Sequence, residues 1–220
     1  TLVLFSDGCP GQNKNYVMVR FLYFLVHGWK LFKEIFYYFP HRGHSRLPND
    51  QDFSLIEAKK RKNNAEVQSD WDTIILSARE NSSLFYLVKV EQSVLFNIVA
   101  SLKPFFNINT KPPMKIKGIC CLHISSDCEY VRVKRNYSGL WETIYVRSKK
   151  KLPLQLTLQR LYKQELAIKP NKLAFLRKLA NFVQTPANQQ YYLNLQAKNG
   201  PGQEYAKTDN EDNSSDAEDL

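Results

Sequence analysis

Cysteine is scarce in this chain of 220 residues. The four cysteines, Cys9, Cys120, Cys121 and Cys128, are irregularly spaced, and no signal peptide precedes them. Small secreted domains that depend on disulfides are much richer in cysteine. We therefore expect a protein of a reducing, intracellular compartment, with the nucleus as one candidate location.

Long apolar runs are also missing. The most apolar run, 16–26, is too short to cross a bilayer and is interrupted by Arg20. We therefore expect no transmembrane segment, no targeting peptide and no membrane partner. What the chain does have is 43% hydrophobic residues, including 13 Phe and 12 Tyr, which is typical of a globular protein. Its length suits one domain with a core, or one domain with a small appendage.

Acidic residues are few outside the carboxy-terminal end. Residues 200–220 contain seven acids and one lysine, and they are expected to be a disordered tail. This tail contributes −6 to a net charge of +10, so residues 1–199 carry +16. A body this basic favours a polyanionic partner, and DNA is the partner that we expect. A soluble protein with an excess of lysine is the alternative.

The first 80 residues show alternating patterns of strands and helices. Leu2-Val3-Leu4-Phe5 is a short apolar run that ends in a loop rich in Gly, Pro and Asn, as a buried strand would. The predicted elements that follow are a buried helix over 16–27 closed by Gly28, a strand over 34–39, and helices over 50–62 and from Ser69 to about Glu80. This order predicts a layered α/β domain.

The pattern changes after Phe85. Residues 85–90 are strand-like, and 92–103 are helical or mixed. Residues 115–147 contain segments that alternate between apolar and polar side chains, at 130–134 and 143–147, which predicts a small antiparallel sheet. A helix is expected over 170–183, with a short further segment over 189–195.

Asp7 is the first residue that could carry chemistry. It stands at the carboxyl end of the predicted first strand, which is where ligands tend to bind in α/β sheets. The alternative is structural, because an Asp in a loop commonly accepts hydrogen bonds from nearby N–H groups.

Asp50, Asp52 and Glu57 form a second acidic group on one predicted helix. Carboxylates there could help to hold Mg²⁺, but acids in the first turn of a helix are also ordinary partners of its dipole. Asp50 and Glu57 lie on one helix face about 10 Å apart, whereas two catalytic metals lie only about 4 Å apart. At most one of these two residues is therefore expected to be a central ligand.

Two further candidates contain histidine. His44 could position a water or touch a phosphate, or it could simply be a surface hydrogen-bonding residue. Cys120, Cys121, His123 and Cys128 resemble a zinc set only loosely, because adjacent cysteines in a strand point to opposite faces of the sheet. We expect ordinary buried cysteines there and no zinc.

Clusters of basic residues could contact phosphates. The most compact cluster is Lys59-Lys60-Arg61-Lys62, at the end of the second predicted helix. The others are Lys149 to Lys151 and the group Arg132, Lys134 and Arg135, which has Tyr130 and Tyr137 nearby. For each cluster the alternative is a solvated charged face.

Two motifs resemble the signatures of an uncharacterised RNase H-like domain family found in transposon-derived animal proteins. The first runs from Ser6 to Asn15 and is similar to S-D-x-C-x-G-Q-N-K-N. The second runs from Gly43 to Asp50 and continues to Ile56-Glu57, similar to G-H-S-x-x-x-x-D followed by I-E. Residues 168–195 look like the family's closing helix. The resemblance spans most of residues 1–195.

This resemblance implies a fold and its boundaries. The fold class expected is α/β: a partial RNase H-like domain, a mixed sheet flanked by helices, over 1–105. A small α+β extension over 106–199 and the acidic tail over 200–220 would follow.

The resemblance also implies a chemistry. RNase H-like transposases use three acids around two Mg²⁺ or Mn²⁺ ions to cleave and join phosphodiesters. Asp7 matches the second acid, and Asp50, or alternatively Glu57, matches the third; His44 lies in the second motif. The first acid would lie on a strand preceding Thr1, so we expect this polypeptide to be inactive alone.

Nucleic-acid contacts are expected from Lys14, Arg46 and the four residues Lys59, Lys60, Arg61 and Lys62. The function expected is that of a transposase-derived protein that binds nucleic acid. The alternatives are a non-catalytic DNA-binding or protein-interaction module that keeps the fold, and an unrelated basic α/β domain.

Overall fold

The computed structural model of the chain describes residues 1–41, 47–81, 83–148, 156–163 and 166–197. These residues divide into two compact units. The sheet unit comprises residues 1–41, 47, 95–148 and 156–161, and the helical unit comprises 48–81, 83–94, 162–163 and 166–197. Each unit is therefore built from segments that are far apart in the sequence.

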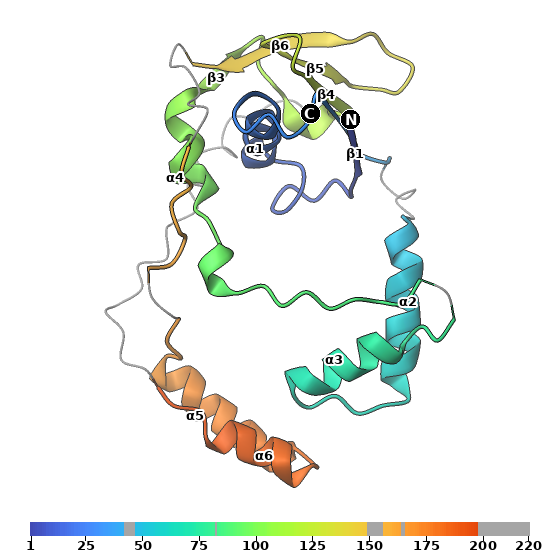
Figure 1. The fold of residues 1–220 in the computed structure, drawn as a ribbon, viewed down its shortest axis with the longest axis vertical. Helices are drawn as coiled ribbons and strands as arrows, with labels where there is room; N and C mark the ends of the chain where they lie inside the picture. Colours follow the sequence, from blue (N-terminus) through green and yellow to red (C-terminus); the bar gives the residue numbers. More distant parts are fainter. Residues whose placement is uncertain (42–46, 82, 149–155, 164–165, 198–220) are drawn as a thin grey trace, which may run out of the picture. The chain divides into compact units, whose positions relative to one another are not determined.

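The sheet unit contains one mixed sheet of six strands (Figure 1). Its order is β1-β2-β4-β5-β6-β3; β1 and β2 are parallel, and every other pair is antiparallel. The α/β prediction with a mixed sheet is confirmed. The strands expected between 115 and 147 extend this same sheet, because β4 pairs with β2. The strands are β1 (Leu2–Phe5), β2 (Glu34–Tyr38), β3 (Phe106–Lys111), β4 (Cys121–Ser125), β5 (Val131–Lys134) and β6 (Glu142–Arg147).

Helix α1 (Tyr16–His27) connects the two parallel strands and provides much of the core. Asn15 caps its start by accepting a hydrogen bond from the N–H of Met18, and Gly28 ends it by donating to the carbonyl of Phe24. A Cβ atom at Gly28 would lie 2.2 Å from the Phe24 ring, so only glycine fits this close approach. Tyr23 and Phe24 are fully buried.

The core of the sheet unit lies between α1 and one face of the sheet. Helix α4 (Ile98–Leu102) lies beside α1 (Figure 1), with short 3-10 turns at Lys103–Phe105 and Ile116–Gly118. The strand side chains on this face are almost completely excluded from water, so their burial is the main stabilising contribution. They are Ile35, Tyr37, Leu122, Ile124, Val131, Val133, Ile144 and Val146.

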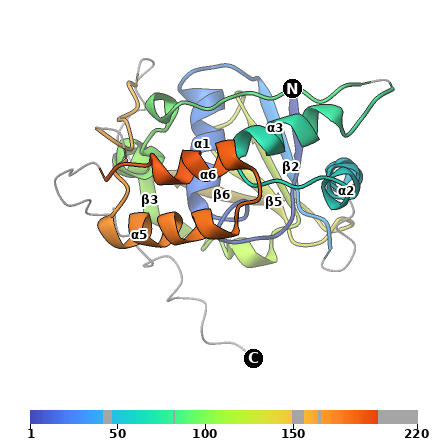
Figure 2. The same ribbon diagram turned by 90° about the horizontal axis from the view of Figure 1, so that it is seen from below.

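The helical unit consists of two pairs of helices. Helices α2 (Pro48–Arg61) and α3 (Gln68–Ser77) form one pair, and α5 (Pro170–Leu179) and α6 (Pro186–Leu193) lie side by side as the other (Figures 1 and 2). Short 3-10 turns occur at Gln92–Val94 and Ala180–Phe182. None of the side chains of α2 is buried, so this helix is held mainly by polar contacts.

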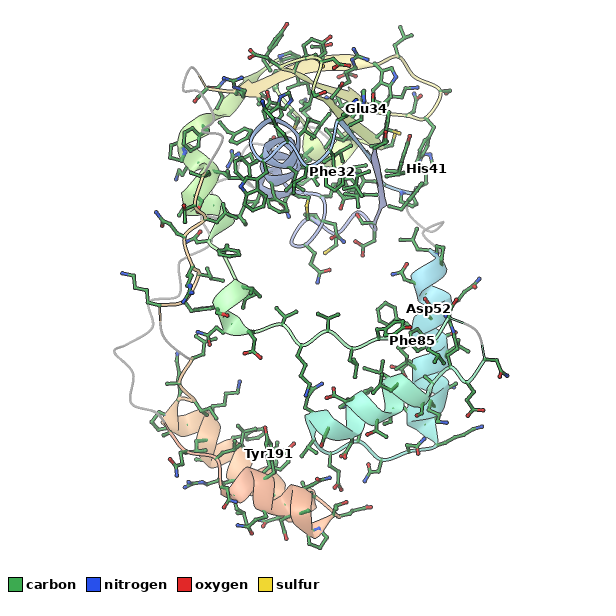
Figure 3. All side chains as sticks on the ribbon, viewed as in Figure 1. Phe32, Glu34, His41, Asp52, Phe85 and Tyr191 are labelled. Atoms are coloured by element: carbon green, nitrogen blue, oxygen red, sulfur yellow. The ribbon has the colours of Figure 1, made fainter. Side chains whose placement is uncertain are left out.

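One polar contact of α2 is an ion pair between Asp52 and Arg79. Figure 3 labels Asp52 and, close to it, Phe85. The Arg79 guanidinium also lies 4.6 Å from the centre of the Phe85 ring. Asp52 thus links α2 to the segment after α3, a structural role that accounts for its charge without any ligand.

Glu66 and Asp70 hold the second helix pair of the unit. Glu66 accepts hydrogen bonds from the backbone N–H groups of Gln184 at 2.6 Å and Thr185 at 3.2 Å, at the start of α6. Asp70 accepts from the N–H groups of Glu66 and Val67, and the amide of Asn188 donates to both carboxylates. The bonds from Gln184, Thr185 and Asn188 join residues 118 or more positions apart.

Two expectations about local structure were wrong. Residues 85–90 form no strand, although Tyr86 and Val88 extend into solvent at 87% and 82% exposure. Helix α3 runs from Gln68 to Ser77 and so ends before Glu80, where the expected helix ended. Within the described ranges, no helix is both long enough and apolar enough to span a bilayer.

Candidate functional site

Asp7 follows β1 and organises the loop that connects it to α1. Its Oδ1 atom accepts hydrogen bonds from the N–H of Cys9 at 3.2 Å and from the Nδ2 of Asn13 at 2.7 Å. The carbonyl of Cys9 in turn accepts from the N–H groups of Gln12, Asn13 and Lys14. The exposed Asp7 carboxylate therefore acts as the cap of a tight loop.

The same loop is anchored to the sheet by its neighbours. The hydroxyl oxygens of Ser6 and Tyr37 are 2.6 Å apart, and burial raises the pKa of the Tyr37 phenol. The Nζ of Lys14 lies 5.0 Å from the centre of the buried Phe39 ring, so this lysine packs against the protein as well as carrying charge. The conformation of the first motif is thus fixed by contacts within the sheet unit.

The other proposed acids belong to the helical unit. Asp50 is exposed in the first turn of α2, and Glu57 is exposed in the middle of that helix. His44 and Arg46 lie outside the described residues. Throughout the part of the chain that the structure describes, no three His, Cys, Asp or Glu side chains come close enough to hold a metal ion.

Within the sheet unit, the described residues bring no group of three His, Cys, Asp or Glu side chains together at Asp7. In the sheet unit, Asp7 has its Oδ1 engaged by two N–H donors of its own loop. Glu34 lies at the opposite end of the sheet, because β1 and β2 are parallel and it begins β2 while Asp7 follows β1.

The cluster Lys59–Lys62 lies at the carboxyl end of α2. Lys60, Arg61 and Lys62 are exposed, whereas the Nζ of Lys59 lies 3.5 Å from a carboxylate oxygen of Glu80. Cations at this end of a helix are favoured by its dipole, which gives them a structural role as well. Three exposed cations on consecutive residues also suit contact with a chain of phosphates.

The cysteines form part of the sheet. Cys120 and Cys121 are buried, and Cys120 Sγ lies 3.3 Å from the carbonyl oxygen of Lys134. The pKa of the Cys121 thiol is raised to about 12. Burial is the largest cause, and the adjacent Cys120 is the second. This thiol is therefore protonated at neutral pH.

The face of the sheet opposite α1 carries aromatic rings that the sequence patterns did not single out. Phe5 stacks on Tyr38 with ring centres 5.1 Å apart, and Phe36 stacks on His123 at 4.2 Å. Trp141 lies against His123 at 5.9 Å. The signal in the sequence was the alternation of β2, whose even-numbered residues Glu34, Phe36 and Tyr38 share this face.

A hollow of about 400 Å³ lies within the helical unit. Its walls include Trp71, Lys172 and Tyr191, the last of which is labelled in Figure 3. Glu66 also lines it, but both oxygens of that carboxylate already accept hydrogen bonds from α6 and the residues before it. The Glu66 carboxylate is therefore already occupied and is not available to a ligand in the hollow.

The comparisons with known proteins place the chain in one family. The profile of a domain of unknown function (DUF7869) matches residues 1–115, slightly more than half of the chain. The chain belongs to the DUF7869 family. No curated protein and no solved structure matches it. The DUF7869 match covers the Asp7 loop, α2 and its basic end, and it ends between β3 and β4.

Proposed function

We propose that this DUF7869 protein binds nucleic acid without cutting it, as a transposase-derived protein with an RNase H-like ancestry. The observation that carries the proposal is the run of three exposed cations, Lys60, Arg61 and Lys62, at the end of α2. A body charge of +16 over residues 1–199 supports it, because such a charge attracts polyanions from a distance.

The contact proposed is with phosphates rather than with bases. Flexible cations on a helix end can follow the spacing of a phosphate backbone, and such contacts carry no sequence information by themselves. Binding of this kind depends on counterion release, so its affinity falls steeply with salt. Such a role would place the protein in the nucleus.

The chain is proposed to bind without cleaving because of the side chains around Asp7. Asp7 caps its own loop through Oδ1, and the described residues gather no set of three metal ligands. We therefore assign the chain a binding role that keeps the ancestral fold.

The test is binding of a fluorescein-labelled 30-base-pair duplex, followed by fluorescence anisotropy over a range of salt concentrations. The triple variant Lys60→Ala, Arg61→Ala, Lys62→Ala should weaken binding and lower the slope of log K against log salt by about 2 to 3, because each phosphate contact contributes about 0.9.

The matched control removes the same charge from three other exposed lysines of the helical unit. The variant Lys163→Ala, Lys172→Ala, Lys178→Ala should change the slope much less. Equal losses in the two variants would show that only total charge matters and would reject the assigned site. Failure of the wild-type protein to bind the duplex at 0.1 M salt would reject the function.

A further inference from the structure

The face of the sheet opposite α1 carries two ordered rows of side chains, of which Cys121 and His123 on β4 are buried. Strand register places Phe5, Tyr38, Cys121 and Lys134 in one row, across β1, β2, β4 and β5. The second row contains Val3, Phe36, His123, Arg132 and Thr143. All of these residues face away from α1, because their neighbours along each strand belong to the core. The face is therefore built by all strands except β3.

The aromatic rings on this face form a continuous stack with two open ends. The rings follow one another in the order Phe5, Tyr38, Phe36 and His123. The planes of neighbouring rings are within 20° of parallel. Phe5 lies at one end and is 60% exposed, and Trp141 lies against His123 at the other end and is 40% exposed. Both terminal rings thus leave surface on which another flat ring could stack.

Cations lie beside the rings. The Nζ of Lys134 is 5.0 Å from the Trp141 ring centre, and Arg132 lies in the row that contains Phe36 and His123. Glu34, the first residue of β2, is an acid on this face, and its Oε1 lies 3.5 Å from the Nε2 of His123. Among the described residues, the sheet unit has thirteen Lys or Arg and five Asp or Glu. The sheet unit as a whole therefore carries a positive charge.

We propose that this face binds single-stranded nucleic acid, with unpaired bases stacking on Phe5 and Trp141 and phosphates held by Arg132 and Lys134. Exposed rings combined with adjacent cations are the arrangement that suits unpaired bases on a charged backbone. The four strands from β1 to β5 span about 14 Å, which is room for two or three bases.

The alternatives fit this face less well. A duplex keeps its bases stacked on each other, so it could not use the exposed rings. The buried centre of a protein interface is usually depleted of charged residues, whereas Arg132 and Lys134 lie within the rows here. This site is distinct from the end of α2, to which the duplex contact is assigned, so the two proposals can fail separately.

The experiment measures binding of fluorescein-labelled dT20 by anisotropy. Phe5→Ala and Trp141→Ala should each weaken binding by about 5- to 100-fold, the usual loss for one base–ring stack. Trp141→Phe should stay within about threefold of the wild-type protein, because it keeps a ring. Tyr86→Ala is the matched control: it removes an aromatic side chain that is 87% exposed in the helical unit, and it should have no effect.

One further measurement separates the stacking of bases from the attraction of charges. A second measurement tests whether this face is already covered in the free protein. Heparin, a polyanion without bases, should bind the wild-type protein and the two ring variants within about twofold of each other. In a Trp29→Phe, Trp71→Phe protein, iodide should quench the remaining Trp141 emission, and dT20 should protect it. Unchanged dT20 affinity in both ring variants would overturn the proposal even if duplex binding through α2 holds. Trp141 emission that iodide cannot reach in the free protein would also overturn it.

Discussion

The role of Asp7 can be tested by comparing Asp7→Asn with Asp7→Ala. In the structure, Oδ1 of Asp7 accepts from the N–H of Cys9 at 3.2 Å and from the amide of Asn13 at 2.7 Å. An asparagine keeps an oxygen in the same position, so it can accept both bonds without the charge. An alanine loses both bonds.

The magnitude follows from those two bonds. The side chain is exposed, so each hydrogen bond should contribute near the lower limit of about 0.5 kcal/mol to the free energy of unfolding. Asp7→Ala should therefore lose about 1 kcal/mol, which corresponds to a fall in Tm of about 2–4 °C for a chain of this size. Asp7→Asn should lose less than half of that.

The assay is thermal unfolding at pH 7 followed by circular dichroism, with and without 5 mM MgCl₂. If Asp7→Asn costs as much as Asp7→Ala, the charge matters and the loop-capping account is wrong. If Mg²⁺ raises the Tm of the wild-type protein but not that of Asp7→Asn, then Asp7 holds a metal ion. The proposal of binding without cleavage would then have to be abandoned.

Two further predictions concern titratable side chains. Hydrogen bonds lower the pKa of Glu66 below its usual 4.5. The bond from the N–H of Gln184 has the largest effect, and bonds from Asn188 and Thr185 add to it. The ionised carboxylate therefore stabilises the helical unit fully above about pH 4.5, and this contribution is lost as the pH falls through the lower, folded-state pKa. Glu66→Gln should remove that part of the pH dependence, measured by Trp emission from pH 7 to 3, and an unchanged acid transition would contradict the assignment. Because burial raises the pKa of Cys121 to about 12, this thiol should react with iodoacetamide at pH 8 far more slowly than the half-buried Cys9, and equal rates by mass spectrometry would refute its burial.

Part of the fold was predictable because its signals are local. The apolar run 16–27, with Gly28 after it, specified α1 with the bounds that the structure shows. The apolar residues 2–5 likewise specified β1, and the aromatic-rich run 34–39 specified β2, which ends one residue earlier at Tyr38. These elements depend on periodicity and on caps that lie within a few residues.

Other features were not predictable because their partners are distant in the sequence. Residues 85–90 have the composition of a strand, but a strand needs a neighbouring edge, and composition cannot show whether one exists. The role of Glu66 depends on N–H groups 118 and 119 residues further along the chain. The ring stack likewise depends on the register of β2 against β4, and no local pattern encodes this register.

For the candidate site, the sequence identified Asp7 and the basic end of α2 but not how their groups are used. The loop motif contains both the carboxylate and its donors, Cys9 and Asn13, so the capping alternative could be stated beforehand. The RNase H-like ancestry and the matching of Asp50 or Glu57 to a third acid stay predictions.

The alternation of the chain between its two units has a consequence for biosynthesis. On a ribosome, β2 emerges long before β4, and β3 before β6, with which each pairs. The sheet thus cannot close until synthesis has passed residue 147, and the segment before α6 reaches Glu66 only after residue 185 has been made. Such late, long-range closure slows folding and prolongs the exposure of apolar strands, so the nascent chain should need a chaperone.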